Sequence, residues 1–167
     1  TNLETYNFKT DVSLKKEKRV YSAGGHYTLG TSKTNDDSGS EVKTETARNW
    51  DVHAKYEQVL TAKVNGFIAA QYEGDEFSGY KQRENTDIGA KYKLHEGDDF
   101  NSFFELGYRY TIERTTTRNA DNDDVFNDQK GRLYYEMNHK IKSGLSYKFW
   151  TEYVKNFTRS EDYLINF

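Results

Sequence analysis

The chain has 167 residues, a formal net charge of −3, and no cysteine or proline. This length suits a single domain, the lack of cysteine excludes disulfides and thiolate chemistry, and the mild acidity argues against a nucleic-acid partner. A mean hydropathy of −1.05 without any long apolar run excludes transmembrane helices. The 14 tyrosines and 10 phenylalanines are a high aromatic content for so polar a chain, and this argues against disorder.

Eight segments alternate between apolar and polar residues, and a ninth begins near the end of the chain. Apolar residues at every second position scatter around a helix but share one face of a strand, so the period predicts strands. In chain order, the predicted strands lie at residues 6–14, 21–29, 49–56, 63–73, 87–94, 104–113, 132–141, 147–156 and 163–167.

The sixth segment shows the pattern most clearly. One face carries only apolar residues, and the other carries polar residues and one glycine; the apolar set is Phe104, Leu106, Tyr108, Tyr110 and Ile112. About ten residues is the length of a strand that crosses a bilayer at a tilt. The segment therefore indicates a membrane-spanning strand with one lipid-facing side.

The connections alternate in length. Short turns are expected near residues 15–18, 58–61, 95–99 and 142–144, and longer polar links near 30–44, 74–79 and 115–129. Outer-membrane barrels have this layout, with the short turns in the periplasm. The sequence thus predicts an all-β fold, an antiparallel up-and-down transmembrane β-barrel, as one domain over residues 1–167.

The same alternation predicts that the barrel is incomplete in this sequence. The first link is short, so the first strand runs toward the periplasm, and the last fragment follows a long link and runs the same way. Bacterial barrels usually have an even strand number with both ends periplasmic. We expect about 8–9 strands here, in a full barrel of about 10–12.

Two features favour lipid on the apolar side. The apolar face carries roughly 35 to 40 residues, too bulky a set for the interior of an eight-stranded barrel. Tyrosines also lie near the ends of many segments, as in interfacial girdles; they are Tyr6, Tyr21, Tyr27, Tyr56, Tyr72, Tyr92 and Tyr153. The alternative is a soluble barrel that holds an apolar ligand inside.

The polar face then lines the lumen, where neighbouring strands carry charges of both signs. Opposite charges on adjacent strands can pair. We interpret the set as a plug of salt bridges, because no ring of a single sign occurs; a charged path for small solutes is the alternative. The predicted lumen charges are Asp87, Lys91, Glu105, Arg109, Glu113, Arg132, Glu136, Lys148 and Glu152.

A distinctive patch precedes the fifth strand, at the expected outer mouth. It consists of Asp75, Phe77, Gly79, Tyr80 and Arg83. One interpretation is a structured hairpin loop in which Arg83 pairs with Asp75 or Glu73; recognition at the mouth is the alternative.

Catalysis and metal binding are not expected. His26 and His53 face the lumen on adjacent strands, but we expect them about four residues apart, too far to share a metal. Ser22 and His26 share a face about 13 Å apart, and no nucleophile elbow is present. Acidic stretches at Asn35–Asp37 and Asp121–Asp124 could hold Ca²⁺ or bridge lipopolysaccharide through divalent ions. The second, read from Asn119, resembles the start of a calcium loop but lacks the glycine at its sixth position and the closing glutamate. We therefore interpret both stretches as solvated loops and predict no cofactor.

One stretch resembles a known family. Residues 71–89 (QYEGDEFSGYKQRENTDIG), together with 107–110 (GYRY), 132–136 (RLYYE) and 150–153 (WTEY), are similar to the salt-induced outer-membrane protein family of Gram-negative bacteria, which is also classed as a domain of unknown function. The resemblance implies a cleaved signal peptide, a strand that ends in a tight Gly-Asn-Thr turn at Thr1, and further strands after Phe167. It brings no catalytic residues.

Three functions remain open. We expect an outer-membrane barrel with a charged, largely filled lumen and a structural or envelope-stress role without catalysis. Its partners would be outer-membrane lipid and lipopolysaccharide. A narrow porin-like channel for small solutes is the first alternative, and a soluble β-barrel that binds an apolar ligand is the second.

Overall fold

The computed structural model describes residues 2–35, 40–117, 124–142, 144–159 and 161–167. Within these residues, nine antiparallel strands form one sheet, and each pairs with the next in chain order. They are β1 (Asn2–Lys16), β2 (Arg19–Asn35), β3 (Glu41–Val59), β4 (Val64–Asp75), β5 (Tyr80–His95), β6 (Phe100–Thr115), β7 (Val125–Lys142), β8 (Leu145–Asn156) and β9 (Tyr163–Asn166), with a 3₁₀ turn, η1 (Glu76–Ser78), between β4 and β5. The all-β, up-and-down arrangement is confirmed.

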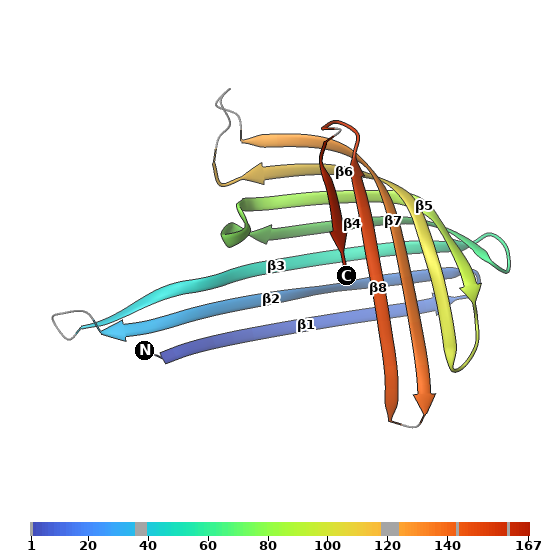
Figure 1. Cartoon of the computed structure of the whole chain (residues 1–167), viewed down its shortest axis with the longest axis horizontal. Helices are drawn as coiled ribbons and strands as arrows, with labels where there is room; N and C mark the ends of the chain where they lie inside the picture. The colour runs from blue at the N-terminus through green and yellow to red at the C-terminus, as the bar shows by residue number, and fades with distance from the viewer. Residues whose placement is uncertain (1, 36–39, 118–123, 143, 160) are drawn as a thin grey trace.

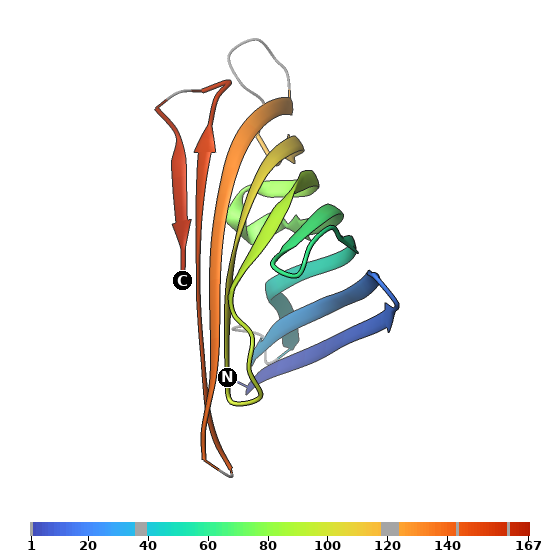
Figure 2. The same ribbon diagram turned by 90° about the vertical axis from the view of Figure 1, so that its right-hand side faces the viewer.

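The sheet curls into a half-barrel with β1 and β9 at its two edges (Figures 1 and 2). The curl brings side chains of non-adjacent strands into contact on one side. Lys55 on β3, for example, reaches Glu105 on β6. Such contacts are possible only on the concave face of a curled sheet, so they identify the face that carries these charges.

Several strands are longer than predicted. The expected link 30–44 is largely strand, because β2 continues to Asn35 and β3 begins at Glu41. These ends carry serine, threonine, lysine and glutamate, whose polarity resembles that of a loop, but their backbones pair beyond a register shift at Gly30/Thr31. The β2–β3 hairpin accordingly extends past its neighbours (Figure 1).

The predicted order of short and long connections is partly retained. At one end of the sheet, two-residue turns join β1 to β2 and β7 to β8, and four-residue links join β3 to β4 and β5 to β6. At the other end, the link predicted at 74–79 shrinks to η1 and Gly79, whereas 116–124 and 157–162 remain longer. None of the described residues forms a helix long and apolar enough to cross a membrane.

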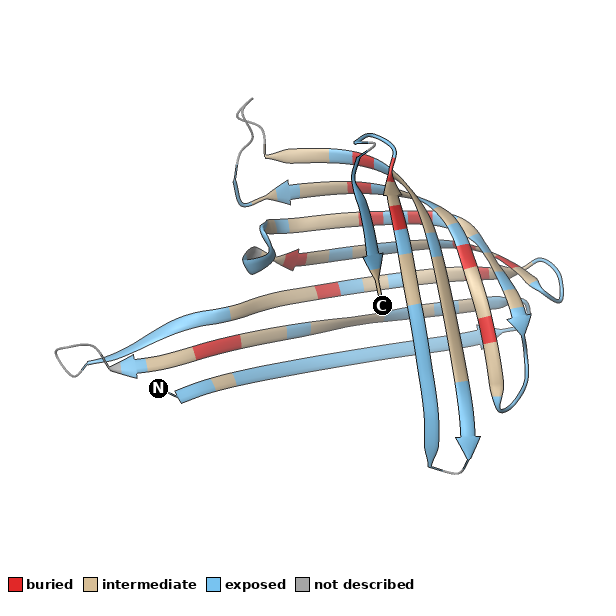
Figure 3. Cartoon of the chain, viewed as in Figure 1, coloured by how far each residue is buried: buried red, intermediate tan, exposed pale blue. Residues whose placement is uncertain are grey.

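Burial is inverted relative to a water-soluble domain. Among the described residues, only Phe67 and Val154 are buried apolar residues, whereas most buried residues are polar or charged. On the convex face, Ile88 is 60% exposed and Leu106 is 62% exposed. Figure 3 shows the buried positions as short bands along otherwise exposed or half-buried strands. The curled sheet therefore encloses its polar face and exposes its apolar face.

Candidate functional site

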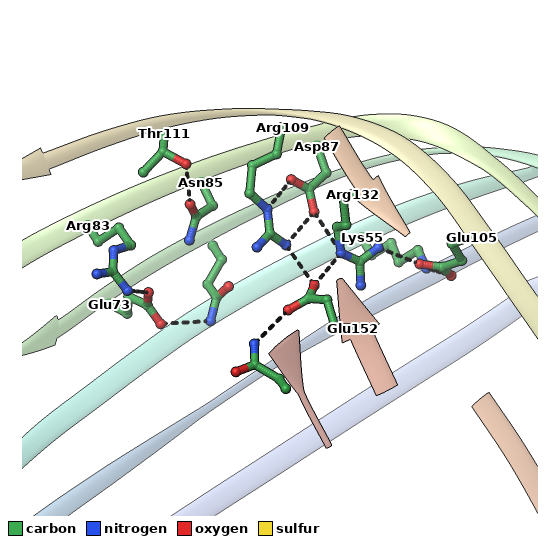
Figure 4. A network of polar contacts seen from close by, with 12 residues as sticks. Lys55, Glu73, Arg83, Asn85, Asp87, Glu105, Arg109, Thr111, Arg132 and Glu152 are labelled. Carbon is green, nitrogen blue, oxygen red and sulfur yellow. Dashed lines mark hydrogen bonds and ion pairs between the residues drawn. The ribbon is translucent and has the colours of Figure 1, made fainter. Parts of the chain in front are cut away.

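Two arginines form the centre of an ion-pair cluster on the concave face (Figure 4). Arg109 lies directly opposite Asp87 in the β5–β6 ladder, and its Nε and Nη2 donate to the two carboxylate oxygens at 2.7 and 2.8 Å. Arg132 Nε donates to Glu152 Oε1 at 2.5 Å, and its Nη1 donates to Glu105 Oε2 at 2.9 Å. Arg109 Nη2 also reaches Glu152 at 3.4 Å. The two guanidinium groups thus share Glu152.

The cluster continues across the concave face to β3. Lys55 Nζ donates a hydrogen bond to Glu105 and lies 3.2 Å from Glu57 Oε1. Lys91 Nζ reaches the same Glu57 oxygen at 3.2 Å, and Asn65 Nδ2 donates to the other oxygen at 3.0 Å. Each carboxylate therefore has at least two partners, as buried charges require.

We call these eight side chains the concave cluster. It comprises four cations, Lys55, Lys91, Arg109 and Arg132, and four carboxylates, Glu57, Asp87, Glu105 and Glu152. Its formal charges balance when all eight groups are ionised. Chemically, such an arrangement fills space and stiffens the sheet, because every charged group is held by partners from neighbouring or more distant strands.

Aromatic rings support the cations of the concave cluster. Lys55 Nζ lies 4.5 Å from the ring centroid of Phe67, and Lys91 Nζ lies 4.0 Å from that of Phe103. The Phe67 ring has room because two glycines face it: a Cβ built on Gly89 would lie 2.8 Å from Phe67 Cζ, and one on Gly107 would lie 3.4 Å away. Phe67 is one of the two buried apolar side chains among the described residues.

The nine predicted lumen charges do not form one network. Six of them belong to the concave cluster: Asp87, Lys91, Glu105, Arg109, Arg132 and Glu152. Glu136 and Lys148 form a separate pair at 3.3 Å, and Tyr134 Oη donates to Glu136 at 2.6 Å. Glu113 pairs with Arg83 instead. The predicted set omitted Lys55 and Glu57, although Lys55 falls on the polar side of the predicted strand at residues 49–56.

The outer-mouth patch is an ordered hairpin loop joined to the concave face. Asp75 caps η1 by accepting from the backbone N–H groups of Phe77 and Ser78 at 3.0 and 3.1 Å, and Gly79 ends the turn with a φ of 88°. A φ in this range strains residues other than glycine. Phe77 remains exposed.

Arg83 connects this loop to the interior of the half-barrel. Its guanidinium lies 3.8 Å from the Tyr80 ring centroid, its Nη1 donates to Glu73 at 3.2 Å, and its Nε donates to Glu113 at 2.6 Å. Of the two expected partners, Arg83 pairs with Glu73. It does not pair with Asp75, because the Asp75 carboxylate accepts hydrogen bonds from the backbone of η1. The geometry thus matches the structured-loop interpretation.

Two polar cavities adjoin these groups on the concave face. One of about 410 Å³ is lined by members of the concave cluster with Tyr134 and Glu136, and one of about 510 Å³ is lined by Arg83, Glu113 and Arg159 among others. Arg159, in the link between β8 and β9, donates from Nη2 to Asp128 at 2.5 Å. This hydrogen bond is the main reason why the pKa of the Arg159 guanidinium is raised; partial burial acts in the opposite direction.

The histidines are closer together than expected. His26 lies opposite Asp51 in the β2–β3 ladder, so it is two residues from His53 rather than four. Asp51 bonds both rings: His26 Nδ1 contacts Oδ1, and His53 Nδ1 contacts Oδ2 at 2.7 Å. His53 Nε2 lies 3.3 Å from Asp11 on the edge strand. The predicted spacing was wrong. The ends of β2 and β3 pair as strands, and the ladder shifts between Gly30 and Thr31, so the register differs from the expected one.

No group of three or more potential metal ligands is found among the described residues. His26 bonds Asp51 and Asn49 rather than Ser22, so the geometry gives no Ser-His pair there. The candidate calcium stretches fall mainly outside the described residues, at 36–37 and 121–123.

Comparisons with known proteins identify a family but no function. Neither the curated proteins nor the solved structures include a match to the chain. A family described as "Protein of unknown function, DUF481" matches residues 1–166, which is nearly the whole sequence. The chain therefore belongs to the DUF481 family.

Proposed function

We propose that this protein is an outer-membrane β-barrel whose lumen is largely filled by charged side chains and whose role in the envelope is structural, without catalysis. The observation that carries the proposal is the inverted sheet. Its convex face exposes apolar residues such as Ile68, Ile88 and Leu106, and its concave face buries the concave cluster. In a bilayer, this arrangement turns the apolar side to lipid and satisfies the polar side internally.

A membrane setting also requires the sheet to close. The edge strands β1 and β9 do not pair with each other. Unpaired backbone N–H and C=O groups are too costly in hydrocarbon, so spanning sheets are closed rings. The proposal therefore includes further strands that pair with these edges and complete a barrel of about 10–12 strands.

The filled lumen favours a structural role over transport. Arg109 and Arg132 lie in the middle of the concave face, and each contacts at least two carboxylates. An ion that passes would have to displace these hydrogen-bonded pairs. The salt-response association implied by the family resemblance is consistent with a protein that reinforces the envelope under osmotic stress.

Planar-bilayer recording of the full-length protein tests this role. We expect no stable conductance above the small, flickering level of a plugged barrel. A large and stable conductance would overturn the filled-lumen proposal while leaving the barrel itself in place.

A narrow channel is the second candidate, and the two adjoining polar cavities favour it. They share Gln71, Asn85 and Arg109 along their walls. Swelling of liposomes that contain the protein, in solutions of small sugars and amino acids, would reveal such a path. If liposomes with this protein do not swell, while liposomes with the same density of a general porin swell rapidly, the channel is excluded.

The soluble-barrel alternative requires the apolar face inside. In this sheet that face is convex, which counts against an internal apolar ligand. We expect the protein to need detergent or lipid and to show heat-modifiable mobility in gels. A monomer that stays in solution without detergent would contradict the membrane proposal.

A further inference from the structure

An apolar groove lies on the convex face across β1 to β5. Its volume is about 570 Å³, and its lining is almost entirely apolar. The walls are Val12, Leu14, Tyr21, Tyr56 and Ile68, and the floor is formed by the small residues Ala23, Ala54 and Ala70 with Thr86. Ala23 lies opposite Ala54, and Ala54 lies opposite Ala70, so the floor runs straight across the ladder. We call this hollow the convex groove.

Two cations lie just beyond one wall of the convex groove. Leu14 is opposite Tyr21 at that wall, and Lys16 is opposite Arg19 one step further along the same face, at the β1–β2 turn. Like charges placed directly opposite in a ladder repel each other. Among the described residues, no carboxylate forms an ion pair with Lys16 or Arg19. An anion between them would relieve the repulsion.

A tyrosine marks the boundary between the groove and the cations. Tyr56 lines the groove with its ring, and its Oη donates to Gln58 Oε1 at 2.8 Å. Gln58 lies opposite Arg19, in the same polar row. Tyrosine is enriched where an apolar layer meets headgroups, because the ring and the hydroxyl prefer different environments. Along the strands toward the β1–β2 turn, the apolar groove is therefore followed by the Tyr56 hydroxyl and then by the Lys16–Arg19 pair.

The spacing of these rows suits a lipid. Val12 at the groove and Lys16 at the cation pair are four residues apart on β1, which is about 13 Å at about 3.3 Å per residue. A phospholipid passes over a similar distance from its phosphate into the upper part of its acyl chains. The charge complementarity selects a lipid with an anionic headgroup.

We propose that the convex groove and the Lys16–Arg19 pair together bind one anionic phospholipid, with an acyl chain in the groove and the phosphate between the two cations. The inference rests on the proposed membrane function and deepens it by naming a lipid for this face. The headgroup would lie beside the short turns, which places the lipid in the leaflet that borders them.

Native mass spectrometry of the full-length protein in nonionic detergent tests the headgroup contacts. We expect more retained phosphatidylglycerol than phosphatidylcholine when both are added at equal concentration. The variant K16Q/R19Q should lose about thirtyfold in phosphatidylglycerol affinity, equivalent to about 1 kcal/mol per cation. The matched control K43Q/K81Q removes two exposed lysines at the opposite strand ends and should bind as the parent protein does.

A groove variant tests the acyl-chain contacts separately. Ala54→Leu fills the convex groove and leaves both cations in place, so it should weaken binding of both lipids. Ala90→Leu adds the same volume on the convex face outside the groove and serves as the control. An unchanged affinity in K16Q/R19Q, an equal loss in K43Q/K81Q, or an unaffected Ala54→Leu protein would each overturn the proposed lipid site.

Insertion into vesicles of pure phosphatidylcholine separates this inference from the proposed function. Insertion there without any preference for phosphatidylglycerol would overturn the lipid site and leave the barrel proposal intact. Failure to insert into either neutral or phosphatidylglycerol-containing vesicles would overturn the barrel proposal, and the lipid site with it.

Discussion

Lys55 on β3 donates a hydrogen bond to Glu105 on β6, although β4 and β5 separate these strands in the sheet. The contact spans the concave face and depends on the curl of the sheet. Glu105 is 2% exposed and also accepts from Arg132 at 2.9 Å. A single carboxylate therefore joins cations from two different strands. In this protein, ion pairs take the place that apolar packing holds in a soluble domain.

Replacing Glu105 with glutamine should destabilise the protein by about 3 kcal/mol. Lys55 and Arg132 would each lose one ionic partner in a buried setting, and their remaining partners, Glu57 and Glu152, limit the effect. Urea unfolding in lipid vesicles, followed by tryptophan fluorescence, measures the change. The control Glu45→Gln breaks an exposed pair with Arg48 and should change stability by less than about 1 kcal/mol. Equal effects of the two substitutions would contradict a buried ionic core.

In the proposed barrel, removing both central arginines should open the lumen. In the double variant R109A/R132A, two large side chains are lost, and Asp87, Glu105 and Glu152 lose their guanidinium partners. Clustered carboxylates attract cations, so we expect a new, cation-selective conductance in planar bilayers. Arg48→Ala, outside the concave cluster, is the control and should behave as the parent protein. No gain in conductance would indicate that other groups block the lumen.

Gly89→Ala should destabilise the sheet by about 1–3 kcal/mol, because the added Cβ overpacks the concave face. That atom would lie 2.3 Å from the Leu106 carbonyl oxygen and 2.8 Å from Phe67 Cζ. Gly66→Ala, in which the nearest atom is a leucine methyl at 3.5 Å, is the matched control and should be nearly neutral. The midpoint of urea unfolding measures both. A neutral Gly89→Ala protein would show that Phe67 does not pack against this glycine.

Asp75→Ala should loosen the loop between β4 and β5 at a cost of about 1 kcal/mol, because η1 loses its N-cap. The amide protons of Phe77 and Ser78 should then exchange faster with solvent, and hydrogen-exchange mass spectrometry can follow them. Ser78→Ala is the control, since it removes only the Oγ bond to Asp75 at 2.7 Å and keeps both amide bonds. Unchanged exchange in the Asp75→Ala protein would argue against the capping role.

The predicted charges illustrate how far the site could be predicted from the sequence. Alternation placed Asp87, Arg109 and Glu152 on one face, and the structure joins them. Lys55 and Glu57 were missed as partners, because their contacts with β5 and β6 cross intervening strands. Such contacts depend on curvature, which a pattern along one strand does not contain.

Register explains the remaining differences. His26 and His53 share Asp51 because the long β2–β3 hairpin pairs in a register that also shifts between Gly30 and Thr31. The polar ends of these two strands looked like a loop, since their side chains carry no apolar alternation. They are strands because their backbones form ladder hydrogen bonds, which do not depend on the polarity of the side chains.

Alternation along the chain was enough to predict the all-β class, the approximate places of the strands and the residues on each face. Period-two alternation is a local consequence of strand geometry, so it can be read without knowing the neighbours. Alternation and bulk also favoured the charged face inside, but which charges meet there follows only from how the whole sheet curls. Curvature and register arise from all the strands together, and they bring Lys55 to Glu105 across two intervening strands.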